Sequence, residues 1–237
     1  MIDERKKDHL KICVNEKVEA GDPGFNEITL KSRSLPELNF EEVSTSSSLL
    51  KHRLDFPLIF DAVTGGTRDA GEYNKALAKI AGEYGVGFGL GSQRAMLEDK
   101  GHAESFKVRD VAEDVFLIAN LGAIQLNYGF GPNECAEVVD MVEADALALH
   151  VNPLQEVFQP EGDTNFQGLR EKINEVCSQI KVPVILKGVG FGLTRQDAEG
   201  LNVDAVNVAG SGGTSWSIIE AHRSGRNTGP FESYGPS

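Results

Sequence analysis

The stretch Ala146-Leu147-Ala148-Leu149, followed directly by His150-Val151-Asn152-Pro153-Leu154-Gln155-Glu156, decides the fold. The four apolar residues predict a buried β-strand. An imidazole, two amides, a proline and a carboxylate then stand at its end, which packing alone would not require. A site for a polar ligand and a cation can use all of them. Because parallel α/β folds carry their chemistry at the carboxyl ends of strands, this stretch indicates such a fold.

Apolar β-type segments alternate with amphipathic helical segments from residue 57 onward, at the roughly 20–40-residue spacing of βα units. Continuous apolar strands flanked by helices predict a parallel sheet that is covered on both faces. The expected strands are Pro57–Val63, Gly85–Leu90, Asp114–Ala119, Asp145–Leu149, Val182–Lys187 and Asp204–Ala209.

Two architectures compete for this pattern, a doubly wound open sheet and a TIM-type (β/α)8 barrel. Polar residues end nearly every expected strand, as a barrel requires when each strand end donates one group to a shared centre. An open sheet instead concentrates its site at one switch point. We therefore predict an α/β barrel as a single domain over residues 57–237. Residues 1–56 are predicted to form an N-terminal extension, with a short helix and a strand or two, that packs on the barrel.

The strand count is about six, whereas a complete barrel has eight. The final residues, Phe231 to Ser237, contain a Pro-Ser helix-start signal with no helix after it. We therefore expect this chain to lack the last two βα units of a full barrel.

The charge balance restricts the partners of this protein. The formal net charge is −13, which argues against broad nucleic-acid binding because that needs a basic face. An anionic substrate would be repelled by the overall field, so its site would need a local cluster of cations, backbone N–H groups or a metal.

The three cysteines, Cys13, Cys135 and Cys177, are far apart and form no CxxC pair. They predict neither a disulfide framework nor a zinc site, and favour a reducing compartment. No secretory signal and no apolar run of membrane-spanning length is found. The sequence therefore predicts a cytoplasmic protein that does not contact a membrane.

Three glycine-rich stretches have both a functional and a structural interpretation. Thr64-Gly65-Gly66-Thr67 allows close backbone approach to a ligand, or simply forms a tight βα turn. The alternating glycines of Gly85–Leu90 could admit a flat ligand, or a neighbouring strand. Gly210–Ser215 has the form of an anion-binding strand end before a helix, or of a loop with a helix cap. None of the three decides between its two interpretations.

Lys187 follows five apolar residues, so an inward side chain must be paired or functional. Schiff-base chemistry, stabilisation of flavin charge and a plain salt bridge all fit it. Glu156 alone would be a solvated charge, but beside a diphosphate it is a candidate Mg²⁺ ligand.

The motifs together resemble those of the type 2, FMN-dependent isopentenyl diphosphate isomerases. They occur in the order and spacing of that family and cover essentially the whole chain. The matching stretches are Arg5-Lys6-Lys7-Asp8-His9, Thr64-Gly65-Gly66-Thr67, Gly91-Ser92-Gln93-Arg94, Ala119-Asn120-Leu121-Gly122, His150 to Glu156, Lys187-Gly188-Val189-Gly190 and Gly212-Gly213-Thr214-Ser215-Trp216.

This resemblance implies a (β/α)8 barrel that interconverts isopentenyl and dimethylallyl diphosphates in isoprenoid biosynthesis. It implies FMN kept reduced by NAD(P)H, Mg²⁺ on the substrate diphosphate, and a homo-oligomer of four or more subunits. The residues implied to contact FMN are Ala62, Val63, Thr64, Gly65, Ser92, Asn120, Lys187 and Thr214. Those implied to line the substrate site are Arg5, Lys6, His9, Ser92, Gln93, Arg94, His150, Asn152 and Gln155. Gln155 and His150 are the implied catalytic residues, and Glu156 the implied metal ligand.

Two departures from the family pattern and two alternatives stay open. Val63 stands where the family often has Met, and Asn207 where Asp is common. The first alternative is another FMN-dependent barrel, such as a 2-hydroxy-acid oxidase or a relative of IMP dehydrogenase. The second is an inactive chain, or half of a split barrel that a second chain completes.

Overall fold

The central element of the fold is a six-stranded parallel sheet. The computed structural model describes residues 2–62, 64–227 and 229. Each strand of the sheet pairs in parallel with the one before it in the chain. The strands are β3 (Ile59–Phe60), β4 (Gly87–Gly89), β5 (Leu117–Gly122), β6 (Ala146–Val151), β7 (Val184–Gly188) and β8 (Ala205–Asn207). This unbroken order is that of a (β/α) barrel, because a doubly wound sheet reverses its order at a switch point.

The sheet curls on itself. In a flat sheet β3 and β7 would lie roughly 19 Å apart, four inter-strand spacings of about 4.8 Å. Yet Nζ of Lys187, on β7, lies 2.6 Å from Oδ1 of Asp61, directly after β3. Only a barrel-like curl brings these ends together, so the predicted α/β barrel class and its six strands are confirmed.

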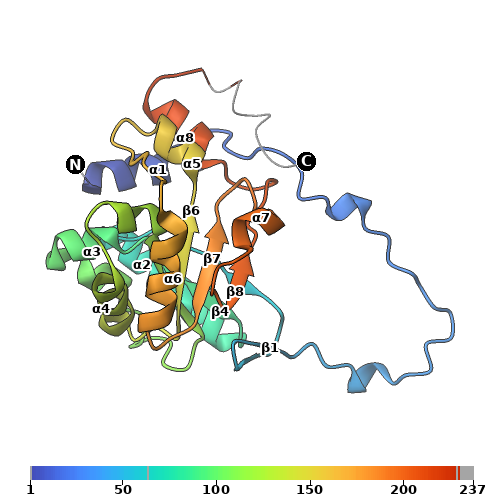
Figure 1. The fold of residues 1–237 in the computed structure, drawn as a ribbon. Coiled ribbons are helices and arrows are strands. Elements are labelled where there is room, and N and C mark those ends of the chain that lie inside the picture. Colours follow the sequence, from blue (N-terminus) through green and yellow to red (C-terminus); the bar gives the residue numbers. More distant parts are fainter. Residues whose placement is uncertain (1, 63, 228, 230–237) are drawn as a thin grey trace.

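Helices follow the strands and cover the outside of the sheet (Figure 1). The main ones are α2 (Arg68–Glu83), α4 (Pro132–Val142) and α6 (Leu169–Gln179), with the short α3 (Arg94–Glu98), α7 (Arg195–Ala198) and 3₁₀ segments η3 (Lys100–Phe106) and η4 (Ala123–Asn127). Thr67 caps α2 by accepting a hydrogen bond from the Ala70 N–H. Gly131 caps α4, and Pro132 takes its first helical position, where the missing N–H costs nothing.

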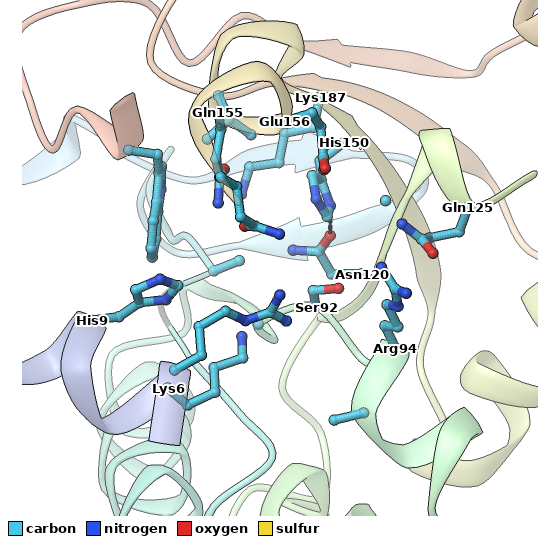
Figure 2. Close-up of a pocket in the computed structure, with 18 residues that line it drawn as sticks. Lys6, His9, Ser92, Arg94, Asn120, Gln125, His150, Gln155, Glu156 and Lys187 are labelled. Atoms are coloured by element: carbon cyan, nitrogen blue, oxygen red, sulfur yellow. Dashed lines mark hydrogen bonds between the residues drawn. The ribbon is translucent and has the colours of Figure 1, made fainter. Parts of the chain in front are cut away.

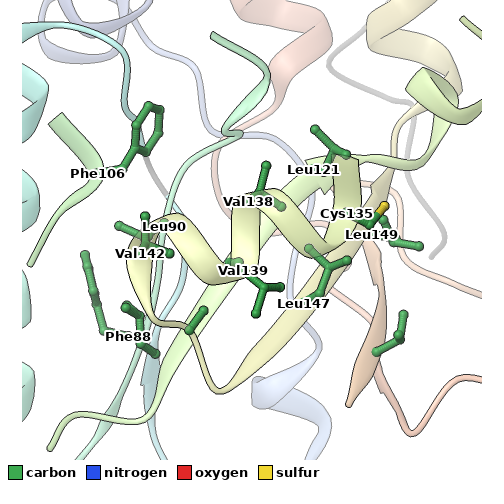
Figure 3. Close-up of a cluster of buried hydrophobic side chains, with 14 of the residues drawn as sticks. Phe88, Leu90, Phe106, Leu121, Cys135, Val138, Val139, Val142, Leu147 and Leu149 are labelled. Carbon is green, nitrogen blue, oxygen red and sulfur yellow. The ribbon is translucent and has the colours of Figure 1, made fainter. Parts of the chain in front are cut away.

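The main hydrophobic core lies between the sheet and these helices. Figure 3 shows α4 laying Val138, Val139 and Val142 against Leu147 and Leu149 of β6. Alternation places the odd-numbered residues of β5 and β6 on this outer face, so the even-numbered ones face the barrel interior.

The interior face has an apolar layer toward the amino ends of the strands, here called the lower layer, and a polar layer at their carboxyl ends. The lower layer contains Ile118, Ala146, Ala148 and Ile185, and the hairpin of β1 (Ser47–Leu49) and β2 (His52–Leu54) packs Leu54 against it. This hairpin closes the amino end of the barrel interior. The polar layer therefore lies at the carboxyl ends, where the sequence predicts the chemistry.

Three helices from distant parts of the chain gather over the carboxyl ends: α1 (Ile2–Asn15), α5 (Pro153–Phe158) and α8 (Trp216–Arg223) (Figure 1). Val18, Ile12, Phe158, Ile218 and Ile219 form a separate apolar cluster there. The short helix and strands expected in residues 1–56 are thus present. The helix lies beside the predicted site.

Residues 20–43 leave this cluster as an extended arm that bows away from the sheet before reaching β1 (Figure 1). The arm carries two 3₁₀ turns, η1 (Phe25–Glu27) and η2 (Phe40–Glu42), and its large apolar side chains are exposed. No helix among the described residues is both long and apolar enough to cross a bilayer.

Candidate active site

A row of residues at the carboxyl ends forms the floor of the site. The strand register aligns Gly122 with His150, His150 with Lys187, and Lys187 with Asn207. Residues paired in register point to the same face of a sheet, here the interior. An imidazole, an ammonium group and an amide therefore line up across three strands, next to a glycine that leaves space.

His150 is held in one orientation by Asn120 of β5. Nδ2 of Asn120 donates to the Leu90 carbonyl (3.0 Å), so its Oδ1 is left to accept from His150 Nδ1 at 2.8 Å. Burial, and then the charges of Lys187 and Lys6, lower the pKa of His150 to about 3. His150 is thus a neutral imidazole that donates from Nδ1 to Asn120.

The short helix α5 presents Gln155 and Glu156 over this row. Pro153 takes its first position, and the Asn152 side chain caps it by accepting from the Gln155 N–H at 3.1 Å. The two functional side chains therefore owe their placement to the Asn-Pro pair before them. Burial, countered by a hydrogen bond from the Asp163 N–H (2.8 Å), raises the pKa of Glu156.

Arg94 approaches from the opposite side of the site, where it already has carboxylate partners. Its guanidinium donates to Glu98 at 2.6 Å and to Asp163 at 2.9 Å, and Gln125 donates to the same Asp163 oxygen at 3.0 Å. Arg94 is thus oriented before any ligand arrives, at the cost of a partly neutralised charge.

The first helix supplies positive charge that is only partly compensated. Arg5 and Lys6 are neighbours on α1, and burial together with the Arg5 charge lowers the pKa of Lys6 to about 8. Arg5 lies 3.6 Å from Glu161, and its buried Nε has no hydrogen-bond partner among the described residues. Such crowded, under-satisfied cations fit an anionic ligand.

His9 connects α1 to α8. Its Nε2 lies 2.8 Å from Oε1 of the fully buried Glu220, and its ring meets Trp216 edge-on at a centroid distance of 5.1 Å. The other Glu220 oxygen accepts from Arg223 Nε at 2.7 Å, and Nη2 of Arg223 donates to both carboxylate oxygens of Glu161 at 2.8 Å.

These side chains surround one cavity, here called the carboxyl-end pocket. Figure 2 shows Lys6 and His9 on α1 facing Lys187 and His150, with Arg94 on another side. The lining residues are Arg5, Lys6, His9, Ala62, Gly91, Ser92, Arg94, Ala95, Asn120, Gly122, Gln125, His150, Gln155, Glu156, Gln159, Lys187, Val189 and Trp216.

Several predicted site residues lie elsewhere. Gln93 is fully buried and holds the Val138 carbonyl and the Asn120 N–H. Asn152 is buried as the cap of α5, and Thr214 is exposed in a bridge to Glu19. None of these three residues lines the carboxyl-end pocket.

The Thr64-Gly65 turn packs closely against neighbouring elements. Thr64 is buried, and its carbonyl accepts from Asn74. A Cβ on Gly65 would lie 2.0 Å from the Phe106 ring, so packing alone requires this glycine. Val63 lies outside the described residues.

Trp216, Glu220, Gln125, Gln159 and Asp61 were missed as site residues. Trp216 lay within a quoted motif, but no spacing pattern singled out Gln125, Gln159 or Asp61. Glu220 follows Trp216 by one helical turn, which was the available signal.

The donor set fits Mg²⁺ bound through a substrate. No cluster of three or more metal-ligating side chains occurs among the residues that the structure places. Mg²⁺ commonly uses one or two carboxylates plus substrate phosphates, and Glu156 is the carboxylate among the residues that line the pocket.

Curated relatives of this chain carry one name. This chain is 48% identical over 228 residues to "Isopentenyl-diphosphate delta-isomerase" of Hydrogenovibrio crunogenus, and the match covers 94% of this chain and 66% of the relative. The Rickettsia bellii protein of that name is 45% identical over 228 residues, covering 94% and 67%. That of Nostoc sp. is 46% identical over 224 residues, covering 92% and 64%. The chain thus spans about two thirds of their length. No family model matches it.

Solved structures share the fold at low sequence identity. An oxidised active mutant of (S)-mandelate dehydrogenase aligns with a TM-score of 0.59 at 16% identity, covering 86% of this chain and 69% of that one. The monotopic membrane protein (S)-mandelate dehydrogenase aligns at 0.57 and 14%, covering 95% and 78%. A mandelate oxidase variant with an FMN adduct aligns at 0.51 and 15%, covering 86% and 66%.

Proposed function

Because the chain belongs to the family of the isopentenyl-diphosphate delta-isomerases, we propose that its carboxyl-end pocket interconverts isopentenyl and dimethylallyl diphosphates. The observation that carries the proposal is the division of the pocket into two zones. Arg5, Lys6 and Arg94 form a cationic zone beside Glu156, while Asn120, His150 and Lys187 form a strand-end zone on the interior face.

The cationic zone suits a diphosphate. Arg5 and Lys6 approach it from α1, and Arg94 is held in position by Glu98 and Asp163. Glu156 would hold Mg²⁺ on the phosphate oxygens, and a cation there would favour the charged carboxylate despite its burial. Together these groups would make the local potential positive, against the field of a protein whose net charge is −13.

The strand-end zone suits FMN, which a structural neighbour carries as an adduct. Ala62, Ser92, Asn120 and Lys187 line it, and Lys187 would face the pyrimidine edge of the flavin. When bound in its reduced form, the flavin supplies proton transfer at the allylic carbons with no net oxidation.

The remaining groups would orient the isoprenoid. The neutral His150 lines the pocket, and the Gln155 amide reaches over the row from α5. Trp216 adds an aromatic wall against which a five-carbon chain can lie. Reduction by NAD(P)H, a cytoplasmic location and a homo-oligomer of four or more subunits stay predictions from the family resemblance.

The proposal is tested by following isopentenyl diphosphate by ¹H NMR in D₂O with the purified chain, FMN, dithionite and Mg²⁺. We expect dimethylallyl diphosphate to appear, with deuterium at the exchanging allylic carbons, and both to require flavin and Mg²⁺. No conversion by a chain that binds FMN would contradict the proposal. Steady consumption of a 2-hydroxy acid would favour an oxidase instead.

A further inference from the structure

Asp61 is a charged residue that the proposed reaction does not use, yet it contacts the strand-end zone. It follows β3, at one edge of the described sheet, and meets side chains from β7 and β8. We infer that Asp61 is a positioning residue: it fixes Lys187 and offsets its charge where the flavin's pyrimidine edge is proposed to lie. The inference therefore rests on the proposed function.

Every oxygen of this carboxylate is engaged. Oδ1 accepts from Lys187 Nζ at 2.6 Å and from the Ala62 N–H at 2.7 Å, while Oδ2 accepts from Asn207 Nδ2 at 2.9 Å. The donors come from β7, from β8 and from the residue after Asp61 itself. The carboxylate is thus fixed from three directions, which a mobile surface ion pair would not be.

The lysine is equally confined. Its side chain is 7% exposed, and its register neighbours on both sides, His150 and Asn207, carry no charge that could compensate it. Asp61 is the carboxylate that pairs with it in the described part of the chain. The pair lies on the interior face, so whatever binds there meets an ion pair rather than a bare ammonium group.

This difference has a consequence for a flavin. Two electrons and one proton convert oxidised FMN into the anionic hydroquinone, which places a negative charge on the pyrimidine side. A bare ammonium group would strongly favour that form, whereas a paired one favours it less. Asp61 would therefore hold the potential of the bound flavin below the value that Lys187 alone would give.

Asn207 gives an independent way to move the charge. It sits at hydrogen-bond distance from Asp61 and in register with Lys187. Asn207→Asp alone would place two carboxylates against each other, which is unfavourable. The double change Asp61→Asn with Asn207→Asp would instead transfer a single carboxylate from β3 to β8 and keep an amide opposite it.

The test compares the midpoint potentials of bound FMN in four proteins. They are the wild-type chain, Asp61→Asn, Lys187→Met, and the double variant that combines Asp61→Asn with Lys187→Met. Asp61→Asn should favour the reduced flavin by about tenfold over wild type, a rise of about 30 mV for a two-electron couple. Lys187→Met should lower the potential, and the double variant should match Lys187→Met, because Asp61 acts through the lysine. The Asp61→Asn, Asn207→Asp exchange should return the potential close to wild type.

An unchanged potential in Asp61→Asn, or a rise that persists without Lys187, would overturn the inference. A second readout needs no flavin: the rate at which Lys187 is reductively methylated, measured by mass spectrometry. Asp61→Asn should raise that rate severalfold over wild type, with Lys75 as the internal reference for an ammonium paired elsewhere. An equal rate would overturn the positioning role, even if the wild-type chain binds no FMN and only the proposed function fails.

Discussion

Nε2 of His9 lies 2.8 Å from Oε1 of Glu220, and this buried contact joins α1 to α8 across the mouth of the barrel. Burial lowers the pKa of His9, so the neutral ring donates from Nε2 to the carboxylate. Its Nδ1 then carries a lone pair, and this buried atom has no partner among the described residues. Diphosphate oxygens only accept hydrogen bonds, so a diphosphate at Nδ1 requires a proton there.

Diphosphate binding should therefore be coupled to proton uptake by His9. Bound diphosphate raises the pKa of His9 above its pKa in the free protein. The affinity for diphosphate is therefore full at low pH and falls as the pH rises through the pKa of His9 in the complex. Calorimetry of inorganic pyrophosphate with Mg²⁺, in buffers of different ionisation enthalpy between pH 6 and 8, measures the uptake. His9→Gln should remove the proton uptake by the protein and leave only the proton uptake by the ligand. Equal proton uptake by the wild-type chain and by His9→Gln would contradict this role of His9.

His150 should stay neutral through the physiological range, since its pKa is lowered to about 3. Its NMR resonance, identified by its loss in His150→Gln, should not titrate between pH 8 and 5. A midpoint near 6.5, the ordinary value for histidine, would refute the buried neutral ring. The unfolded chain takes up this proton and the folded chain does not, so the free energy of unfolding should fall as pH drops from about 6.5 toward 3.

Gln155→Ala and Glu156→Ala should each lower turnover by roughly 10²–10⁴-fold and leave FMN affinity largely intact. Both side chains come from α5, above the strand ends that are proposed to hold the flavin. Steady-state kinetics with fluorescence titration of FMN separates the two effects. Normal Mg²⁺-dependent turnover in Glu156→Ala would show that the metal assignment is wrong. Lys187→Ala is the contrasting variant, in which flavin function should weaken.

Gly91→Ala should destabilise the fold by about 1–3 kcal/mol or more, because the new Cβ would lie 2.3 Å from the backbone oxygen of Thr64. Gly213→Ala is the matched control: nothing lies within 4 Å of its Cβ position, so it should fold normally. Urea denaturation measures both. Equal stability of the two variants would contradict the close approach of the Gly91 and Thr64 backbones.

The sequence was sufficient for the barrel because each strand carried its own signal. Leu147 and Leu149 alternate with Ala146 and Ala148, and His150 then marks the polar end of the same strand. Apolar continuity and strand-end chemistry are local features, so they could be read without knowing what lies across the interior.

The parts that sequence reasoning did not supply are long-range contacts. Asp61 and Lys187 are separated by 126 residues, and His9 and Glu220 by 211. The residues next to each of these side chains in the sequence do not indicate which distant residue it contacts. The alternating glycines proved ambiguous for the same reason: a Cβ on Gly89 would lie 3.3 Å from the Ala62 nitrogen, so the segment that follows β3 occupies the space offered to a flat ligand.

The most direct measurement is a titration of the purified chain with FMN, followed by absorption before and after dithionite. The account predicts a perturbed, protein-bound spectrum for both the oxidised and the reduced flavin. Lys187→Ala should weaken FMN binding, and Gln155→Ala should leave it unaffected. A spectrum identical to that of free FMN at every protein concentration would contradict the claim that the strand ends of β3 to β8 build a flavin site.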